Sequence, residues 1–306
     1  MSMINLEGII PATVTPMTKD YKVDDEALRD YIRWLLKFKI GGLAINVDTG
    51  EGPHLYRSEK TRILRVVKET VGSRVPIVAG LQANFTAEAV EASKKFKEAG
   101  ANAFLVFPIP AFIGQPLPPE IPCSYHKAIY DAAEVPLVLF QLQKDLGGVE
   151  YTPSCLLKLA ELEGVTAIKE ASFDAMKFLR TLRLLRSAPR KITILTGNDN
   201  FILESLILGA DGALIGFGTI AVDLQVEMFN LVKKSRYREA AEIWNRLQPL
   251  ADIIFAPPVR NYRIRLKEAL VQLGVLKEAY VRPPLTPLSE TERNTVRDAL
   301  KKAEIL

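Results

Sequence analysis

The chain has 306 residues, of which 48% are hydrophobic and 25% are charged. This composition supplies a large hydrophobic core and excludes a wholly disordered chain. The 40 Lys and Arg residues outnumber the 36 Asp and Glu residues by four, giving a net charge of +4. So small an excess does not indicate nucleic acid as a partner.

Two cysteines, Cys123 and Cys155, are too few for a disulfide framework and lack the paired spacing of a zinc or iron–sulfur site. We expect small buried apolar residues at both positions, and no metal. The N-terminal residues contain no basic segment followed by a long apolar one, and Glu204 and Asp211 interrupt the apolar region 201–222. We therefore expect no signal peptide and no membrane span, and predict a cytoplasmic protein.

Short β-branched runs of about six residues alternate with amphipathic stretches of about 12 residues from residue 8 to about residue 235. Asp24 and the pair Thr152-Pro153 are typical helix starts within this pattern. Such alternation indicates repeated βα units and a parallel sheet. The predicted strands are 8–15, 42–47, 75–80, 103–107, 137–142, 166–169, 192–196 and 213–216.

Eight strands and eight helices in about 230 residues predict an α/β fold, a (β/α)8 TIM barrel, over residues 1–235. A doubly wound sheet is the alternative, but no G-x-G-x-x-G follows the first strand. Residues 236–306 break the alternation, with helical patterns at 238–251, 259–274 and 289–302. We expect a C-terminal helical extension packed on the barrel.

The segment 108–122 contains six prolines and follows the fourth predicted strand. It is therefore predicted at the mouth of the barrel, as a semi-rigid rim or a subunit contact. A proline-rich recognition segment is the alternative.

In a TIM barrel the reacting groups lie at the C-terminal ends of the strands, which directs attention to Lys169. Strand alternation places Val165, Ala167 and Lys169 on one face and Ile168 on the other. If the first face is the inner one, the ammonium is partly desolvated, its pKa falls, and the free amine attacks carbonyl groups. A register shifted by one residue would instead leave Lys169 as a solvated cation.

Five short motifs in chain order resemble one enzyme family. They are Pro11-Ala12-Thr13-Val14-Thr15-Pro16, Asp48-Thr49-Gly50-Glu51, Pro76-Ile77-Val78-Ala79-Gly80, Ala167-Ile168-Lys169-Glu170-Ala171 and Gly209-Ala210-Asp211-Gly212. Together they resemble the dihydrodipicolinate synthase / N-acetylneuraminate lyase family. The resemblance implies a TIM barrel, usually a homotetramer, whose strand-six lysine forms an imine with pyruvate or another 2-oxo acid and needs no metal or other cofactor. Lys169 matches that lysine.

The family's second motif, G-T-T-G-E, holds the substrate carboxylate through its threonine pair. Thr49 matches the second threonine, so the resemblance implies that it anchors the carboxylate, while Asp48 replaces the first threonine. Apolar neighbours at the barrel mouth would raise the pKa of Asp48 and make it a general base. Alternatively, Asp48 caps the following turn.

Three matched positions lack hydroxyl or guanidinium groups that the family uses. Phe140-Gln141 stands where the family has Tyr-Asn, Lys144-Asp145-Leu146-Gly147 contains no arginine, and Phe107-Pro108 replaces Thr-Pro. A phenyl ring transfers no protons. We therefore predict a divergent Schiff-base lyase rather than a dihydrodipicolinate synthase. The alternatives are a 2-keto-3-deoxy sugar-acid dehydratase, a cyclic imino-acid deaminase, and a non-catalytic ligand-binding barrel.

The remaining site residues are predicted from their places at strand ends. Phe140 and Gln141 would shape the pocket, Asn198 and Asp199 would bind substrate hydroxyls or form a helix-capping turn, and Gly216 would let the backbone approach the imine. A phosphate cradle at Gly216 is disfavoured, because no Lys or Arg is nearby in the sequence.

Three further polar residues are expected to take no part in catalysis. Glu170 should point away from the barrel axis and form a structural salt bridge or a helix-facing hydrogen bond. His54 is expected on a surface loop, although it could reach the far end of a substrate, and His126 is given no catalytic role.

Overall fold

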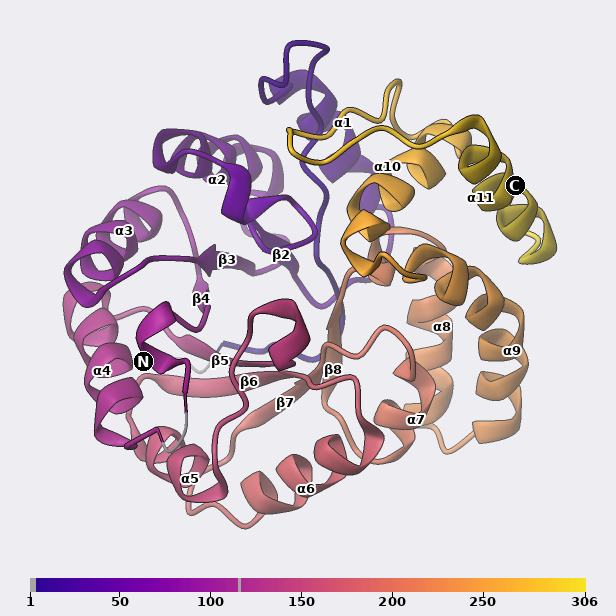
Figure 1. Cartoon of the computed structure of the whole chain (residues 1–306). Coiled ribbons are helices and arrows are strands. Elements are labelled where there is room, and N and C mark those ends of the chain that lie inside the picture. Colours follow the sequence, from indigo (N-terminus) through magenta and orange to yellow (C-terminus); the bar gives the residue numbers. More distant parts are fainter. Residues whose placement is uncertain (1–3, 115–116) are drawn as a thin grey trace.

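The computed structural model describes residues 4–114 and 117–306 and has the predicted fold, eight parallel strands ringed by helices (Figure 1). The strands are β1 (Gly8–Pro11), β2 (Leu43–Ile45), β3 (Ile77–Leu81), β4 (Ala103–Val106), β5 (Leu137–Leu142), β6 (Val165–Ala171), β7 (Thr193–Thr196) and β8 (Gly212–Ile215). The helices are α1 (Asp25–Leu35), α2 (Arg57–Val71), α3 (Thr86–Glu98), α4 (Glu120–Ala133), α5 (Pro153–Glu161), α6 (Ala175–Arg186), α7 (Ile202–Ile207), α8 (Val222–Lys233), α9 (Tyr237–Ile254), α10 (Tyr262–Gln272) and α11 (Glu290–Lys302).

The sheet closes on itself almost completely. Consecutive strands from β2 to β8 pair in parallel, and β1 pairs in parallel with β8. β1 and β2 are joined by a single bridge between Ala12 and Ala44, next to which the Thr13 amide donates to the Ala44 carbonyl at 3.0 Å. This closure brings the C-terminal ends of all eight strands to one mouth.

Apolar side chains form two separate cores, as alternation along strands inside a barrel requires. One core fills the space between the strands and the surrounding helices. The other lies inside the barrel and consists of small and medium residues together with Phe107 and Phe140. Leu6, just before β1, also belongs to the inner core, at the end of the barrel opposite the mouth.

Two of the predicted helix starts show their capping bonds. The Asp24 carboxylate accepts from the Ala27 amide at 3.0 Å, and the Thr152 hydroxyl accepts from the Cys155 amide at 3.3 Å, directly before Pro153. Each bond satisfies an amide that has no partner within the first helical turn.

Strand β6 corrects one detail of the predicted register. Val165 lies in the outer core together with Ile168, whereas Ala167 and Ala171 lie in the inner core. The pairing with β5 shifts between Leu137 and Val138, so that Val165 pairs with Leu137 but Ala167 pairs with Val138. The extra residue reverses the alternation before Ala167, and the prediction that Val165 shares the face of Lys169 was wrong.

The helices that follow the barrel, α9 to α11, are present as expected. α9 lies along α8, and α11 lies along α9 and α10 (Figure 1). α10 is connected to the barrel mouth by a fully buried ion pair between Lys267 and Glu51, and Lys267 Nζ also donates to the Tyr280 carbonyl. This connection matters for the site, because Glu51 lies two residues after Thr49, in the same loop after β2 as Asp48.

Other expectations concern single segments. In the described ranges, no helix is long and apolar enough to cross a bilayer. Both cysteines are free thiols, and Cys155 is buried while Cys123 is partly exposed. In the proline-rich segment, Pro108 lines a cavity at the mouth and Ile113 is 67% exposed; positions 115 and 116 lie outside the described residues.

Candidate active site

Lys169 points into the barrel from β6. Its Nζ lies 4.7 Å from the centre of the Phe140 ring, which belongs to the inner core, and only 9% of the residue is exposed. Burial lowers the pKa of this ammonium, while the carboxylates of Asp199 and Asp48 act in the opposite direction. Lys169 is therefore not the solvated cation of the alternative interpretation, and its neutral form is more populated than that of a surface lysine.

The stem of Lys169 packs against Gly197, at the end of β7. A Cβ atom at position 197 would lie 2.4 Å from Lys169 Cε and 3.0 Å from Lys169 Cγ. Only glycine leaves room for the lysine chain in this position. The Phe140 ring lies beside the ammonium and packs edge-on against Phe107 at 4.9 Å between ring centres, so apolar groups surround this side of the amine.

Asp199 supplies a buried carboxyl group near Lys169. It follows β7, and its Oδ1 accepts from the Phe217 amide at 2.8 Å. Burial raises the pKa of Asp199 to about 7, although this amide, the Lys169 charge and the Gly216 backbone all favour the ionised form. Because the Phe217 amide already donates to Asp199, this amide in the turn after β8 is not free to bind a phosphate.

Thr49 and Gly216 meet at the other side of the mouth. A Cβ atom on Gly216 would lie 3.2 Å from Thr49 Oγ1 and 3.3 Å from the Tyr262 ring, so glycine permits a close approach of the two loops. The hydroxyl oxygens of Thr49 and Tyr262 lie 3.4 Å apart, within hydrogen-bond distance, while the Tyr262 proton is donated to Asp48. Both residues lie where the sequence places them, and their roles toward a substrate stay predictions.

Asp48 does not have the environment that was predicted for it. The Arg263 Nη2 atom donates to its carboxylate at 2.6 Å, Arg260 Nη1 at 3.2 Å and the Tyr262 hydroxyl at 2.9 Å. Burial raises the pKa of Asp48, but the two guanidinium groups and the hydroxyl outweigh burial and leave the pKa below its usual value. A carboxylate held ionised in this way is a weak base, which corrects its assignment as general base.

The side chains of Gln141 and Asn198 are held by hydrogen bonds on the side of the strands that faces the helices. Gln141 Nε2 donates to Thr181 of α6 at 3.0 Å and to Glu170 at 3.3 Å, and Asn198 Nδ2 donates to Glu170 at 2.8 Å. The Asn198 Oδ1 atom accepts from the Phe173 amide at 2.7 Å. The predictions that Gln141 and Asn198 bind substrate are corrected. Alternation along β5 turns Gln141 toward the helices, and Asn198, which lies beyond the end of β7, is held by its bonds to Glu170 and to the Phe173 amide. Glu170 forms the structural hydrogen bonds that were one of its two expected roles.

A cavity of about 440 Å³ opens at the barrel mouth, lined by residues that follow β2, β3, β4 and β5 and by the C-terminal segment. Its polar lining includes His54, which therefore faces the cavity. Burial lowers the pKa of His54, with Arg263 acting in the same direction. His126 is fully buried on α4, where burial lowers its pKa to about 4 and Nδ1 contacts the Pro122 carbonyl.

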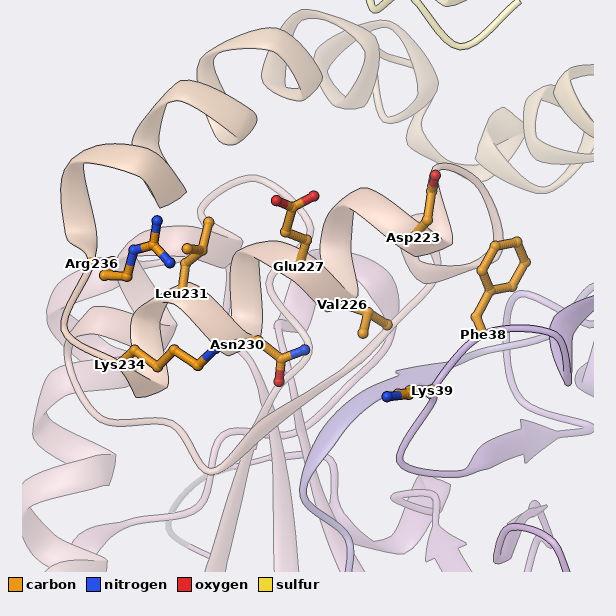
Figure 2. A pocket seen from close by; sticks show the side chains of 9 residues that line it. All are labelled: Phe38, Lys39, Asp223, Val226, Glu227, Asn230, Leu231, Lys234 and Arg236. Atoms are coloured by element: carbon orange, nitrogen blue, oxygen red, sulfur yellow. The ribbon is translucent and has the colours of Figure 1, made fainter.

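Another cavity, of about 400 Å³, lies outside the barrel between α8 and the segment after α1 (Figure 2). Its lining includes Phe38 and Lys39 from the segment after α1, Asp223 from α8, and Arg236 from the connection between α8 and α9. None of the residues around Lys169 contributes to it, so we place the candidate site at the barrel mouth. Elsewhere in the described chain, no three His, Cys, Asp or Glu side chains gather closely enough to hold a metal ion.

Sequence reasoning missed the contribution of the C-terminal segment. Arg260, Tyr262 and Arg263 reach the mouth from around the start of α10, more than 200 positions after Asp48. One signal was available: α10 carries Arg263, Arg265 and Lys267 among apolar residues without a separate polar face. Charges on a helix that is buried all round need partners, and such a pattern predicts contacts with the barrel.

Comparisons with known proteins give consistent matches over nearly the whole chain. The model of the Dihydrodipicolinate synthetase family matches residues 5–303. The chain is 30% identical to the 4-hydroxy-tetrahydrodipicolinate synthase of Archaeoglobus fulgidus, covering 98% of this chain and 99% of that protein. It is 31% identical to the enzyme of the same name from Methanothrix thermoacetophila, covering 96% of each chain.

Solved structures of proteins with the same family name also match over nearly the whole chain. The dihydrodipicolinate synthase of Acinetobacter baumannii, crystallised in complex with pyruvate, has a TM-score of 0.87 and 30% identity, covering 98% of this chain and all of that chain. The dihydrodipicolinate synthase of Thermotoga maritima has a TM-score of 0.89 and 26% identity, covering 98% of this chain and 99% of that chain.

Proposed function

Because the chain belongs to the dihydrodipicolinate synthetase family, we propose that it is a lyase in which Lys169 forms a Schiff base with pyruvate or another 2-oxo acid. The observation that carries this proposal is the buried amine on the inner face of β6, whose pKa burial lowers. A neutral amine is required for attack on the ketone carbon, and loss of water then gives the imine. The crystal structure of the Acinetobacter baumannii relative contains pyruvate, which supports the substrate class.

The substrate carboxylate is assigned to Thr49. Its hydroxyl and backbone amide lie on the loop after β2, next to the turn at Gly216, where the missing side chain lets the two loops approach each other closely. Hydrogen bonds to a charged carboxylate are stronger than those between neutral groups, so one hydroxyl is sufficient to orient it.

Asp199 is assigned the proton transfers that Phe140 cannot perform. Once protonated, the imine draws electrons from C3 of the substrate, and a base near that carbon removes a proton or returns one. The Asp199 carboxyl is held near Lys169 by the Phe217 amide, and its pKa of about 7 lets it serve as either acid or base near neutral pH.

We further propose that the reaction differs from that of the curated relatives named 4-hydroxy-tetrahydrodipicolinate synthase. Three groups used by synthases are replaced: the strand-five hydroxyl by Phe140, the arginine beyond it by the segment Lys144 to Gly147, and a further hydroxyl by Phe107. Product analysis by NMR with a 2-keto-3-deoxy aldonate separates the alternatives. Pyruvate plus an aldehyde indicates cleavage, whereas a retained carbon skeleton indicates dehydration.

Reductive trapping tests the Schiff base itself. The protein is incubated with each of a panel of 2-oxo acids, reduced with borohydride, and its mass is measured before and after proteolysis. We expect the mass of the reduced substrate on Lys169 and none in Lys169→Arg, which keeps a positive charge but has no nucleophilic amine. Lys60 is the matched control, because burial also lowers its pKa, to about 8, and Lys60→Arg should still give the adduct.

The absence of an adduct on Lys169 with every compound of the panel would refute the proposal and favour a ligand-binding barrel. That alternative predicts that Lys169→Ala still binds its ligand. We also propose the homotetramer that the resemblance implies, and sedimentation equilibrium of the purified chain tests it.

A further inference from the structure

The cavity at the barrel mouth has an unusual charge distribution. Two guanidinium groups, Arg260 and Arg263, line it together with a single carboxylate, Asp48. Among the described lining residues, the other ionisable group is His54, whose pKa burial lowers below its usual value. The lining therefore carries a net positive charge at the entrance to a site whose proposed substrate is an anion.

The hydrogen bonds of the two arginines leave donors available. Arg263 donates from Nε to the Asp48 carbonyl at 2.8 Å and from Nη2 to the Asp48 carboxylate. Neither of these two bonds uses its Nη1 atom. The Arg263 side chain is 3% exposed. Arg260 is 42% exposed and uses Nη1 for Asp48 and Nη2 for the Leu146 carbonyl, at 2.6 Å, so Nε stays unpaired among the described residues.

These arginines are fixed in place. Arg263 is buried and bound twice to Asp48, and Arg260 bridges the loops after β2 and β5 through Asp48 and Leu146. Guanidinium groups held in this way are prepared to bind a carboxylate through parallel hydrogen bonds with little further loss of side-chain entropy. His54, another residue of the cavity lining, has an Nδ1 atom that is buried without a hydrogen-bond partner in the described part of the chain.

From this arrangement we infer that the mouth of the barrel binds a second carboxylate, at the far end of the 2-oxo acid substrate, through Arg260 and Arg263. The inference rests on the proposed function, because it takes Lys169 and Thr49 to hold the 2-oxo acid end. Asp48 lies between the two regions: its charge acts on Lys169, and it is ion-paired with both arginines. The cavity volume of about 440 Å³ is ample for a chain of a few carbons beyond the reacting ketone.

A matched pair of probes tests the inference. 2-Oxoglutarate and 2-oxopentanoate have the same chain length and differ in a terminal carboxylate against a methyl group. The half-saturating concentration of each is measured by borohydride trapping, with pyruvate trapped in parallel. We expect 2-oxoglutarate to saturate at a concentration about 10- to 100-fold lower than 2-oxopentanoate, the effect of hydrogen bonds to a charged group.

Two variants should move this ratio in opposite directions. Arg260→Leu removes the exposed guanidinium and should bring the ratio to within about threefold of unity, whereas Asp48→Asn removes the competing carboxylate and should increase it. Arg236→Leu is the control: this arginine lies by the outer cavity of Figure 2, where it pairs with Glu239, and its loss should leave the ratio unchanged.

The outcomes separate the two claims. Equal half-saturation of the two probes, or a preference that survives Arg260→Leu, overturns the second-carboxylate site while the Schiff-base proposal stands. Trapping of pyruvate but of neither longer probe also overturns it, because the mouth then excludes the longer chains. No adduct with any probe, including pyruvate, refutes the proposed function and this inference with it.

Discussion

Replacing Gly197 with alanine tests whether the position of the Lys169 stem limits imine formation. The new Cβ would lie 2.4 Å from Lys169 Cε and 2.9 Å from Ala171 Cβ. Carbon atoms in contact prefer separations of about 3.5–4.0 Å, so the lysine chain must move by about 1 Å. A displacement of about 1 Å costs about 10²-fold in rate, and we expect trapping of pyruvate to slow by that factor. The protein should still fold, with a loss of about 1–3 kcal/mol from overpacking.

The assay follows adduct formation over time: samples are quenched with borohydride at intervals, and the mass of the intact protein is measured by mass spectrometry. Gly218→Ala is the matched control, because its Cβ would approach no atom closer than 3.2 Å and none of its nearest atoms belongs to Lys169. Thermal unfolding of both variants shows whether a slow rate reflects a damaged fold. Trapping of Gly197→Ala at the wild-type rate would show that the inward position of Lys169 does not control the chemistry.

Three further changes have defined outcomes. Because burial raises the pKa of Asp199 to about 7, the folded protein keeps a proton that the unfolded chain loses near pH 4. The free energy of unfolding therefore falls as pH rises between these values, by up to about 1.4 kcal/mol per pH unit. Asp199→Asn should remove this decline in urea unfolding at pH 5 and 7, and should slow turnover by about 10²–10⁴-fold; an unchanged pH dependence of stability would contradict the burial of an acid here. Thr49→Val should raise the half-saturating concentration of pyruvate in trapping by about tenfold, the effect of one hydrogen bond to a charged group, and an unaltered concentration would remove Thr49 from the site. Lys267→Met leaves the Glu51 carboxylate buried without its cation and should cost about 3–5 kcal/mol in urea unfolding; a loss below about 1 kcal/mol would mean that the pair does not hold α10 to the mouth.

The barrel could be predicted because its strands are buried on both faces and are separated by capped helices. Such strands appear as short apolar runs, and the helix starts at Asp24 and Thr152 carry their own capping residues. The inward direction of Lys169 followed from alternation with Ala167. The same rule failed for Val165, because alternation assumes uninterrupted pairing and the register with β5 shifts at Leu137.

The electrostatics of the site could not be predicted, because they depend on contacts between distant segments. Asp48 appears crowded by apolar residues in the sequence, yet its pKa is governed by guanidinium groups 212 and 215 positions away. Asp199 lies beyond the end of β7, where strand alternation no longer predicts which way a side chain points. The Phe217 amide that donates to Asp199 comes from a different βα unit. Long-range pairing of this kind leaves no periodic signal in the chain.

The most direct measurement is the crystal structure of the protein soaked with pyruvate and reduced in place. We predict continuous electron density from Lys169 Nζ to C2 of the compound, with the carboxylate at Thr49 and C3 facing Asp199. Unmodified Nζ beside a compound bound elsewhere, or a C3 atom turned away from Asp199 toward Asp48, would contradict the assignment of these residues.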